Sequence, residues 1–182
     1  VFDAAVDPTL GYVDGLVLQA GGFERSFDAF LDWCDRQKCS FIGPGSDARD
    51  AFDQLADAID ANPPINDGRP ATTEGILSIG ISQSLYGDYA WPRLADALDA
   101  AKAGDGAGLL DLYDAYFGGY DDGHRSNMLD AYFVITCADR RLLFEPDDIL
   151  AQADRLETVA PRLGMGWIQE MLICSQWTAP PS

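Results

Sequence analysis

Hydrophobic residues recur along most of this chain at intervals of three and four, which is the spacing of one face of an α-helix. The pattern is clearest between residues 12 and 38, where an apolar stripe extends over several turns. Its members are Phe23, Phe27, Phe30, Leu31 and Cys34. Because glycine weakens a helix, the pair Gly21-Gly22 predicts that this segment is either two helices or one kinked helix.

Turn and capping residues divide the rest of the chain into shorter helical segments. Ser46 is a candidate N-cap for a helix that Pro63-Pro64 ends, and Thr72 or Thr73 is a candidate N-cap for the next helix. Later apolar groups with helical spacing are Leu94 with Leu98, Leu109 with Tyr113, Met128 with Tyr132, Ile149 with Leu156, and Trp167 with Cys174. The pattern predicts a mainly α fold with seven or eight helices and little or no strand.

The chain contains four cysteines, Cys34, Cys39, Cys137 and Cys174, which allow three pairings. Cys34 and Cys39 are near enough in sequence to close a small loop at a helix end, and Cys137 and Cys174 would then join two distant segments. An even number of cysteines without a Cys-x-x-Cys motif favours disulfides over a zinc site. Two disulfides would place the protein outside the cytoplasm, either secreted or in the cell envelope.

The formal net charge of the chain is −18. A surface of this kind repels nucleic acid and anionic lipid, so neither is an expected partner. No uncharged apolar run reaches the roughly 18 residues that a membrane span requires. Solubility explains the charge without any ligand. The alternative is that the acidic surface attracts a cationic group, such as the free amino terminus of a peptide.

The sequence contains no complete set of catalytic residues. The single histidine, His124, lies in a polar loop beside Asp122 and Arg125, where a surface role is the simpler interpretation. The chain has no Gly-x-Ser-x-Gly elbow, no HExxH motif, no Walker A loop and no GxGxxG motif. We therefore expect no catalytic residue, no metal and no cofactor within this chain.

Two groups of side chains are candidates for ligand binding. Tyr86 and Trp91 belong to an aromatic cluster before a predicted helix, and aromatic residues with polar tips often line clefts. The alternative for this cluster is ordinary core packing. Asp130 and Asp139 flank an apolar run, and a carboxylate that faces a closed cleft can hold a substrate ammonium by a charge-assisted hydrogen bond. The alternative for each aspartate is a solvated charge on a helix surface.

Five stretches of the chain, in order, resemble secreted bacterial tripeptidyl aminopeptidases, which are serine peptidases of the α/β-hydrolase fold. Residues 1–8 are similar to the end of the sixth sheet strand of that family, and residues 23–34 are similar to its first cap helix. The other three stretches are Tyr86 with Trp91-Pro92-Arg93-Leu94-Ala95-Asp96-Ala97-Leu98, Asp130-Ala131 with Ile135-Thr136-Cys137-Ala138-Asp139, and Cys174-Ser175-Gln176-Trp177. In that family the serine elbow lies upstream of this part, and the acidic residue and histidine of the triad lie downstream.

The resemblance implies that this chain is the helical cap, or lid, of such a hydrolase. Residues 1–11 would be the remnant of a hydrolase strand and loop, residues 12–177 the lid, and residues 178–182 a linker back to the hydrolase. The lid would restrict access to the active site. Alone it would be inactive, and it would tend to self-associate through an apolar face that the hydrolase normally covers.

The resemblance also implies a role for one lid carboxylate, which would bind the N-terminus of the peptide substrate and fix its distance from the scissile bond. Asp130 and Asp139 are the first candidates for this role, and Glu24 is a third. The competing hypothesis is a free-standing acidic helical module that binds either a basic protein partner or a small molecule.

Overall fold

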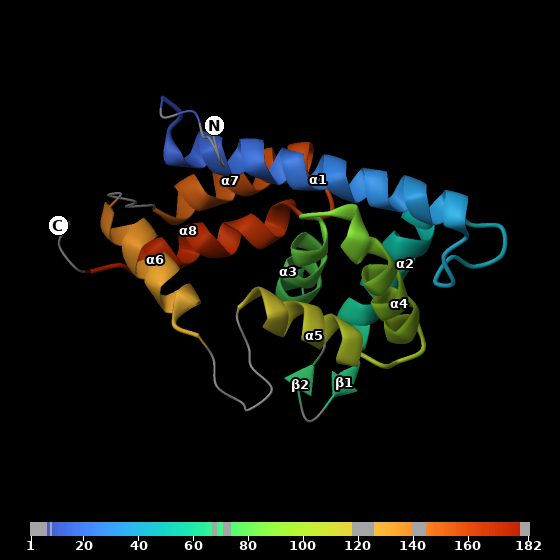
Figure 1. Cartoon of the computed structure of the whole chain (residues 1–182). Helices are drawn as coiled ribbons and strands as arrows, with labels where there is room; N and C mark the ends of the chain where they lie inside the picture. The colour runs from blue at the N-terminus through green and yellow to red at the C-terminus, as the bar shows by residue number, and fades with distance from the viewer. Residues whose placement is uncertain are drawn as a thin grey trace.

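The computed structural model describes residue 7 and residues 9–66, 69–70, 74–117, 126–139 and 145–178. These residues form eight α-helices, two 3-10 helices and one short hairpin, so the predicted mainly α fold is confirmed (Figure 1). The helices are α1 (Tyr12–Gln37), α2 (Ala48–Ala61), α3 (Glu74–Ser84), η1 (Asp88–Ala90), α4 (Trp91–Lys102), α5 (Ala107–Tyr116), α6 (Met128–Asp139), α7 (Pro146–Val159), η2 (Gly164–Trp167) and α8 (Ile168–Ser175). None of these helices is both long and apolar enough to cross a bilayer.

The longest element, α1, is one continuous helix of 26 residues, so of the two alternatives predicted at Gly21-Gly22 the division into two helices is wrong, and the kink stays a prediction. Each glycine costs a helix about 1 kcal/mol relative to alanine. Against this cost, α1 buries nine residues, including Gly21 itself. Helix α7 and η2 pack beside α1, and burial on several sides outweighs the weak helical preference of two residues.

The interior contains two clusters of buried apolar side chains, and α1 contributes to both of them. The first cluster lies between the second half of α1 and helices α2 to α5 and includes Phe27, Phe30, Phe52, Ile81, Leu94, Leu98 and Leu109. The second lies between the first half of α1 and helices α7 and α8 and includes Leu16, Val17, Ala20, Leu156, Ile168 and Met171. Helix α1 therefore holds the two halves of the fold together.

Local sequence signals account for most helix ends, with one correction. The N-cap of α2 is Asp47 rather than the predicted Ser46, because the Asp47 carboxylate accepts a hydrogen bond from the backbone N–H of Asp50 at 2.9 Å. Helix α2 ends before Pro63, as predicted. The strands β1 (Ile65–Asn66) and β2 (Arg69–Pro70) form the short antiparallel hairpin that follows. The predicted N-caps Thr72 and Thr73 lie outside the described residues.

Both predicted disulfides are confirmed. Cys34–Cys39 closes the turn that follows α1, and Cys137–Cys174 joins α6 to α8. In the turn closed by Cys34–Cys39, Lys38 adopts a left-handed backbone conformation, with φ of 59°. The expected strand remnant in residues 1–11 falls largely outside the described residues, and the loop that contains His124 lies entirely outside them. The domain boundaries remain predictions.

Candidate functional site

The described structure places one carboxylate among tyrosine hydroxyls contributed by different helices. Glu170 lies on α8, and its Oε2 accepts a hydrogen bond of 2.7 Å from the hydroxyl of Tyr132 on α6. Its Oε1 accepts a hydrogen bond from the hydroxyl of Tyr12 at the start of α1. Both oxygens of the carboxylate are therefore held in place by neutral donors. Among the described residues, no ion pair involves Glu170.

The packing of the helices explains why these three residues meet. Tyr12 is anchored because the first turns of α1 pack into the second apolar cluster beside α8. On α6, Tyr132 precedes Cys137 by five residues, and on α8, Glu170 precedes Cys174 by four. Both side chains therefore lie about one helical turn before the disulfide that joins the two helices. The disulfide fixes the relative position of the tyrosine and the carboxylate.

Two tyrosines in this region have shifted pKa values. Desolvation, together with the hydrogen bond to Glu170 and its negative charge, raises the pKa of Tyr132 well above its ordinary value. Burial raises the pKa of Tyr116 to about 12, with further contributions from Tyr86 and Glu170. Both phenols therefore stay protonated at neutral pH and act as donors. The negative charge of this cluster stays on the carboxylate.

Tyr86, one of the predicted binding residues, lies at the edge of this region. Its side chain is 64% exposed, and its hydroxyl forms a hydrogen bond with Tyr116. Its ring packs edge-on against Phe23, with 5.7 Å between the ring centroids, and Phe23 contacts Trp167, the last residue of η2. Tyr86 is thus linked to the neighbourhood of Glu170 through a second tyrosine.

Trp91, the other predicted aromatic residue, lies elsewhere. It is half-buried against the first apolar cluster, where its ring contacts Phe30 and Trp33 with centroid distances of 6.1 and 5.9 Å. Its indole Nε1 is buried and has no hydrogen-bond acceptor among the described residues. These contacts are those of a packing residue. The structure does not bring Trp91 together with Tyr86 in one cleft.

The structure separates the three predicted carboxylates. Asp130 is exposed in the first turn of α6, and Asp139 is the last residue of that helix, with a side chain that is not described. Glu24 is 5% exposed in the middle of α1. Its Oε2 accepts hydrogen bonds from the backbone N–H groups of Arg162 and Leu163, at 3.3 and 3.1 Å. Glu24 therefore joins α1 to the segment before η2.

An arginine completes the surroundings of Glu24. The guanidinium of Arg162 lies 3.8 Å from Glu24 Oε1 and forms two hydrogen bonds with the Asp53 carboxylate, at 2.8 and 2.9 Å. Burial raises the pKa of Glu24, although the two backbone N–H groups and the charge of Arg162 act in the opposite direction. Backbone N–H groups thus occupy Glu24 Oε2, whereas the buried Oε1 lies near Arg162 without a hydrogen-bond partner among the described residues. The described contacts of Glu24 are structural, and its predicted role toward a substrate stays a prediction.

Glu170, Tyr12 and Tyr132 were not among the residues predicted from the sequence. One signal was available for Glu170, which is the only charged residue in the apolar tail between Trp167 and Cys174. A single carboxylate in an otherwise apolar helix needs partners if it is to be buried even in part. The identity of those partners depends on how α1, α6 and α8 meet, which the sequence pattern does not reveal.

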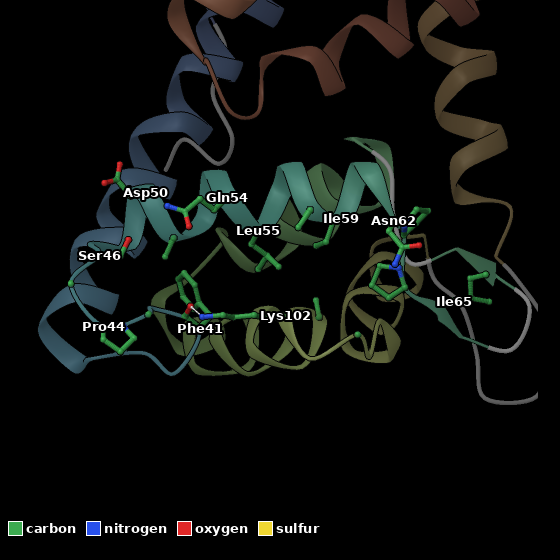
Figure 2. A pocket seen from close by; sticks show the side chains of 18 residues that line it. Phe41, Pro44, Ser46, Asp50, Gln54, Leu55, Ile59, Asn62, Ile65 and Lys102 are labelled. Carbon is green, nitrogen blue, oxygen red and sulfur yellow. Dashed lines mark hydrogen bonds between the residues drawn. The ribbon is translucent and has the colours of Figure 1, made fainter.

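A second feature is an open groove of about 930 Å³ between α2, the turn after α1 and the end of α4. Figure 2 shows Leu55 and Ile59 of α2 directed toward Lys102, whose ammonium donates a hydrogen bond of 2.8 Å to the carbonyl oxygen of Phe41. Asp50 and Lys102 are the charged residues that line the groove. The groove has room for a ligand, but its lining contains no pair of nucleophile and base.

Neither feature contains the components of a catalytic centre. Within the part of the chain that is described, no group of three histidine, cysteine, aspartate or glutamate side chains is arranged to hold a metal ion. All four cysteines are in disulfides. What the Glu170 cluster offers chemically is a fixed negative charge with lone pairs available to a positively charged ligand.

No protein-family model matches the chain. The chain is similar to Carboxylesterase B of Mycobacterium tuberculosis, with 28% identity over 189 residues that cover 99% of this chain and 36% of that protein. It is also similar to Serine protease Hip1 of Mycobacterium tuberculosis, with 26% identity over 195 residues that cover all of this chain and 37% of that protein. The Hip1 protein of Mycobacterium bovis matches to the same extent. These similarities support a relation to hydrolases, of whose length the chain spans little more than a third.

Proposed function

We propose that this chain is the lid of a secreted α/β-hydrolase serine exopeptidase of the tripeptidyl aminopeptidase type, and that it binds the N-terminus of the peptide substrate. The observation that carries the proposal is the Glu170 carboxylate, held by tyrosine hydroxyls on two other helices. The similarity of the whole chain to about a third of a carboxylesterase and of a serine protease supports it. The two disulfides support a location outside the cytoplasm.

The chemistry of the cluster suits a primary ammonium group. Each oxygen of Glu170 accepts one tyrosine hydroxyl, which leaves lone pairs that can accept hydrogen bonds from an –NH₃⁺ group. Charge-assisted hydrogen bonds of this kind are stronger than neutral ones. A carboxyl-terminal or acetylated peptide end would gain none of these contacts.

In this proposal the lid acts by positioning, and the bond-breaking groups belong to the rest of the hydrolase. A substrate whose ammonium is held at Glu170 presents a peptide bond at a set distance along its backbone, and this distance determines how many residues are released. Closure of the lid also excludes water other than the attacking water from the cleft. The lid by itself is therefore expected to hydrolyse no peptide.

The test is the Glu170→Gln substitution in the full-length gene product, assayed on a peptide with a free N-terminus and on the same peptide acetylated there. Loss of the charge-assisted hydrogen bonds should raise KM for the free peptide by about tenfold to a hundredfold, with a smaller change in kcat. The acetylated peptide should be cleaved equally by both forms. An unchanged KM for the free peptide would contradict the assignment of Glu170.

Asp130→Asn and Asp139→Asn serve as matched substitutions, because they remove single carboxylates of α6 without touching Glu170. If the clamp is at Glu170, both variants should keep the KM of the unmodified enzyme. A selective rise in KM for the free peptide in either variant, with Glu170→Gln unaffected, would transfer the role to that aspartate.

The groove beside α2 favours a second candidate function, that of a free-standing acidic module that binds a small molecule or a basic partner. The gene distinguishes the two functions. A reading frame with a Gly-x-Ser-x-Gly motif shortly before Val1 and a histidine after Ser182 supports the lid. A reading frame limited to these residues supports the module.

A further inference from the structure

Helices α6 and α8 expose large apolar side chains next to the Glu170 cluster. On α6, Met128, Tyr132, Val134 and Ile135 are between 45% and 59% exposed. On α8, Ile173 is 41% exposed. We call these five residues the α6–α8 face, which belongs to two helices that pack together and share the Cys137–Cys174 disulfide (Figure 1).

This face is unusual for a helix on the surface of a soluble domain. Such a helix normally has one apolar stripe and an opposite polar side. Helix α6 has one charged residue, Asp130, between Met128 and Ala138, although the chain has 30 acidic and 12 basic residues. Single exposed apolar residues need no explanation, but a group of them on neighbouring helices marks an interaction surface. The face therefore fits an apolar partner and not a basic one.

We propose that the α6–α8 face docks on the hydrolase portion of a longer polypeptide that contains this chain, an inference that rests on the proposed lid function. Two observations favour this occupant. The chain spans only 36% and 37% of the length of the hydrolases that it resembles, so the remainder of such a protein is available to cover the face. In addition, Tyr132 belongs both to the face and to the Glu170 cluster, which ties docking to the site.

The shared tyrosine explains why the hydrolase is a better occupant than a second copy of the lid. If the hydrolase covers the α6–α8 face, Glu170 lies at the boundary between lid and hydrolase, where a substrate amine must be held. A second copy on this face would instead close off the carboxylate from any peptide. Docking and substrate positioning then depend on the same pair of helices.

The three methionines of the chain provide a test without substitution, by mild peroxide oxidation of the full-length gene product and mass spectrometry of its peptides. Met128 lies on the face and is 51% exposed, Met165 lies outside it and is 40% exposed, and Met171 is fully buried. An uncovered face predicts that Met128 is oxidised at least as fast as Met165. Docking predicts that Met128 is oxidised about tenfold more slowly, because the open state is populated in few molecules.

Two further measurements identify the occupant. Ile135→Glu places a charge on the face and should restore the oxidation of Met128, whereas Leu18→Glu, at a 60% exposed position of α1, should not. The protection of Met128 should persist on dilution. Oxidation of Met128 as fast as that of Met165 would overturn the proposal, and protection lost on dilution would assign the face to a second copy.

The outcomes also separate this inference from the lid function itself. Rapid oxidation of Met128 in an enzyme whose Glu170→Gln variant has a raised KM would reject docking through this face and retain the amine-binding lid. Protection of Met128 with an unchanged KM would retain docking and reject the amine role. A gene that encodes no hydrolase portion would reject both.

Discussion

Tyr132 on α6 donates its hydroxyl hydrogen to Glu170 Oε2 on α8 at 2.7 Å, about one turn from the disulfide between Cys137 and Cys174. The same two helices are thus joined by one polar contact and one covalent bond. Because few other described contacts hold α6 in place, these two connections determine the position of the tyrosine relative to the carboxylate. The hydrogen bond and the disulfide can be removed separately, and the effect of each removal on the free energy of unfolding can be measured.

Tyr132→Phe should lower the free energy of unfolding by about 1 kcal/mol, because it removes one hydrogen bond to a charged group that is partly exposed to solvent. Equilibrium unfolding in urea would measure the change. Tyr89→Phe is the control, since Tyr89 is 84% exposed and should tolerate the loss of its hydroxyl without a measurable change. Equal effects of the two substitutions would show that the bond between Tyr132 and Glu170 contributes nothing to stability.

The two disulfides should contribute unequally to the free energy of unfolding. Cys137 and Cys174 are separated by 37 residues, whereas Cys34 and Cys39 are separated by five. If a disulfide acts by restricting the unfolded chain, replacing Cys137 and Cys174 by serine should lower the free energy of unfolding by about 4 kcal/mol. Replacing Cys34 and Cys39 should lower it by about 2 kcal/mol. Urea unfolding of the two double variants tests the order. A larger loss for the Cys34–Cys39 pair would point to native contacts, not loop length, as the cause.

The buried Glu24 should give the stability a specific pH dependence. Because burial raises its pKa above the ordinary value of 4.5, the folded state binds a proton that the unfolded state has already released in the pH window between the two values. The stabilising contribution is complete below the ordinary pKa and is lost as pH rises through the raised one. The unmodified chain should therefore lose stability relative to Glu24→Gln as the pH rises from below 4.5 through the raised pKa of Glu24.

Thermal unfolding of both proteins across this pH range provides the measurement. The glutamine variant retains an acceptor for the backbone N–H groups of Arg162 and Leu163 but cannot ionise, so subtracting its curve removes the contribution of every other acidic group. A difference that stays constant, or that grows in favour of glutamate with rising pH, would mean that burial does not dominate at Glu24.

Much of this fold follows from local signals in the sequence. Pro63 and Pro146 mark the end of one helix and the start of another because proline has no backbone N–H and a fixed φ. The spacing of the cysteines correctly favoured disulfides, including the short loop between Cys34 and Cys39. Such signals act over a few residues, and they predict elements better than they predict contacts.

The failures share a different origin. Gly21-Gly22 did not divide α1, because tertiary packing on α7 and η2 overrides a local preference. Glu170 was not predicted because its partners lie on α1 and α6, at sequence separations of 158 for Tyr12 and 38 for Tyr132. No local pattern specifies which helix faces pack together. A binding site assembled from three helices depends on that packing, so the local sequence does not predict it.

Arg162 should matter more to stability than Arg49, although both join helices by ion pairs. The side chain of Arg49 is 35% exposed and pairs with Asp28 and Asp32, which are more exposed still. Removing such a surface contact by Arg49→Met should cost less than about 1 kcal/mol. The side chain of Arg162 is 20% exposed, and its loss would leave the buried carboxylate of Glu24 without its nearest positive charge.

Arg162→Met should therefore cost about 2 to 3 kcal/mol in urea unfolding at neutral pH, because an uncompensated buried charge remains. If this reason is right, the double variant with Glu24→Gln should recover part of the loss, since glutamine removes the charge and keeps an acceptor for the backbone of Leu163. Arg49→Met combined with Glu24→Gln should show no such recovery. If the effects of Arg162→Met and Glu24→Gln are additive, the arginine instead stabilises the fold through Asp53, with which it forms two hydrogen bonds.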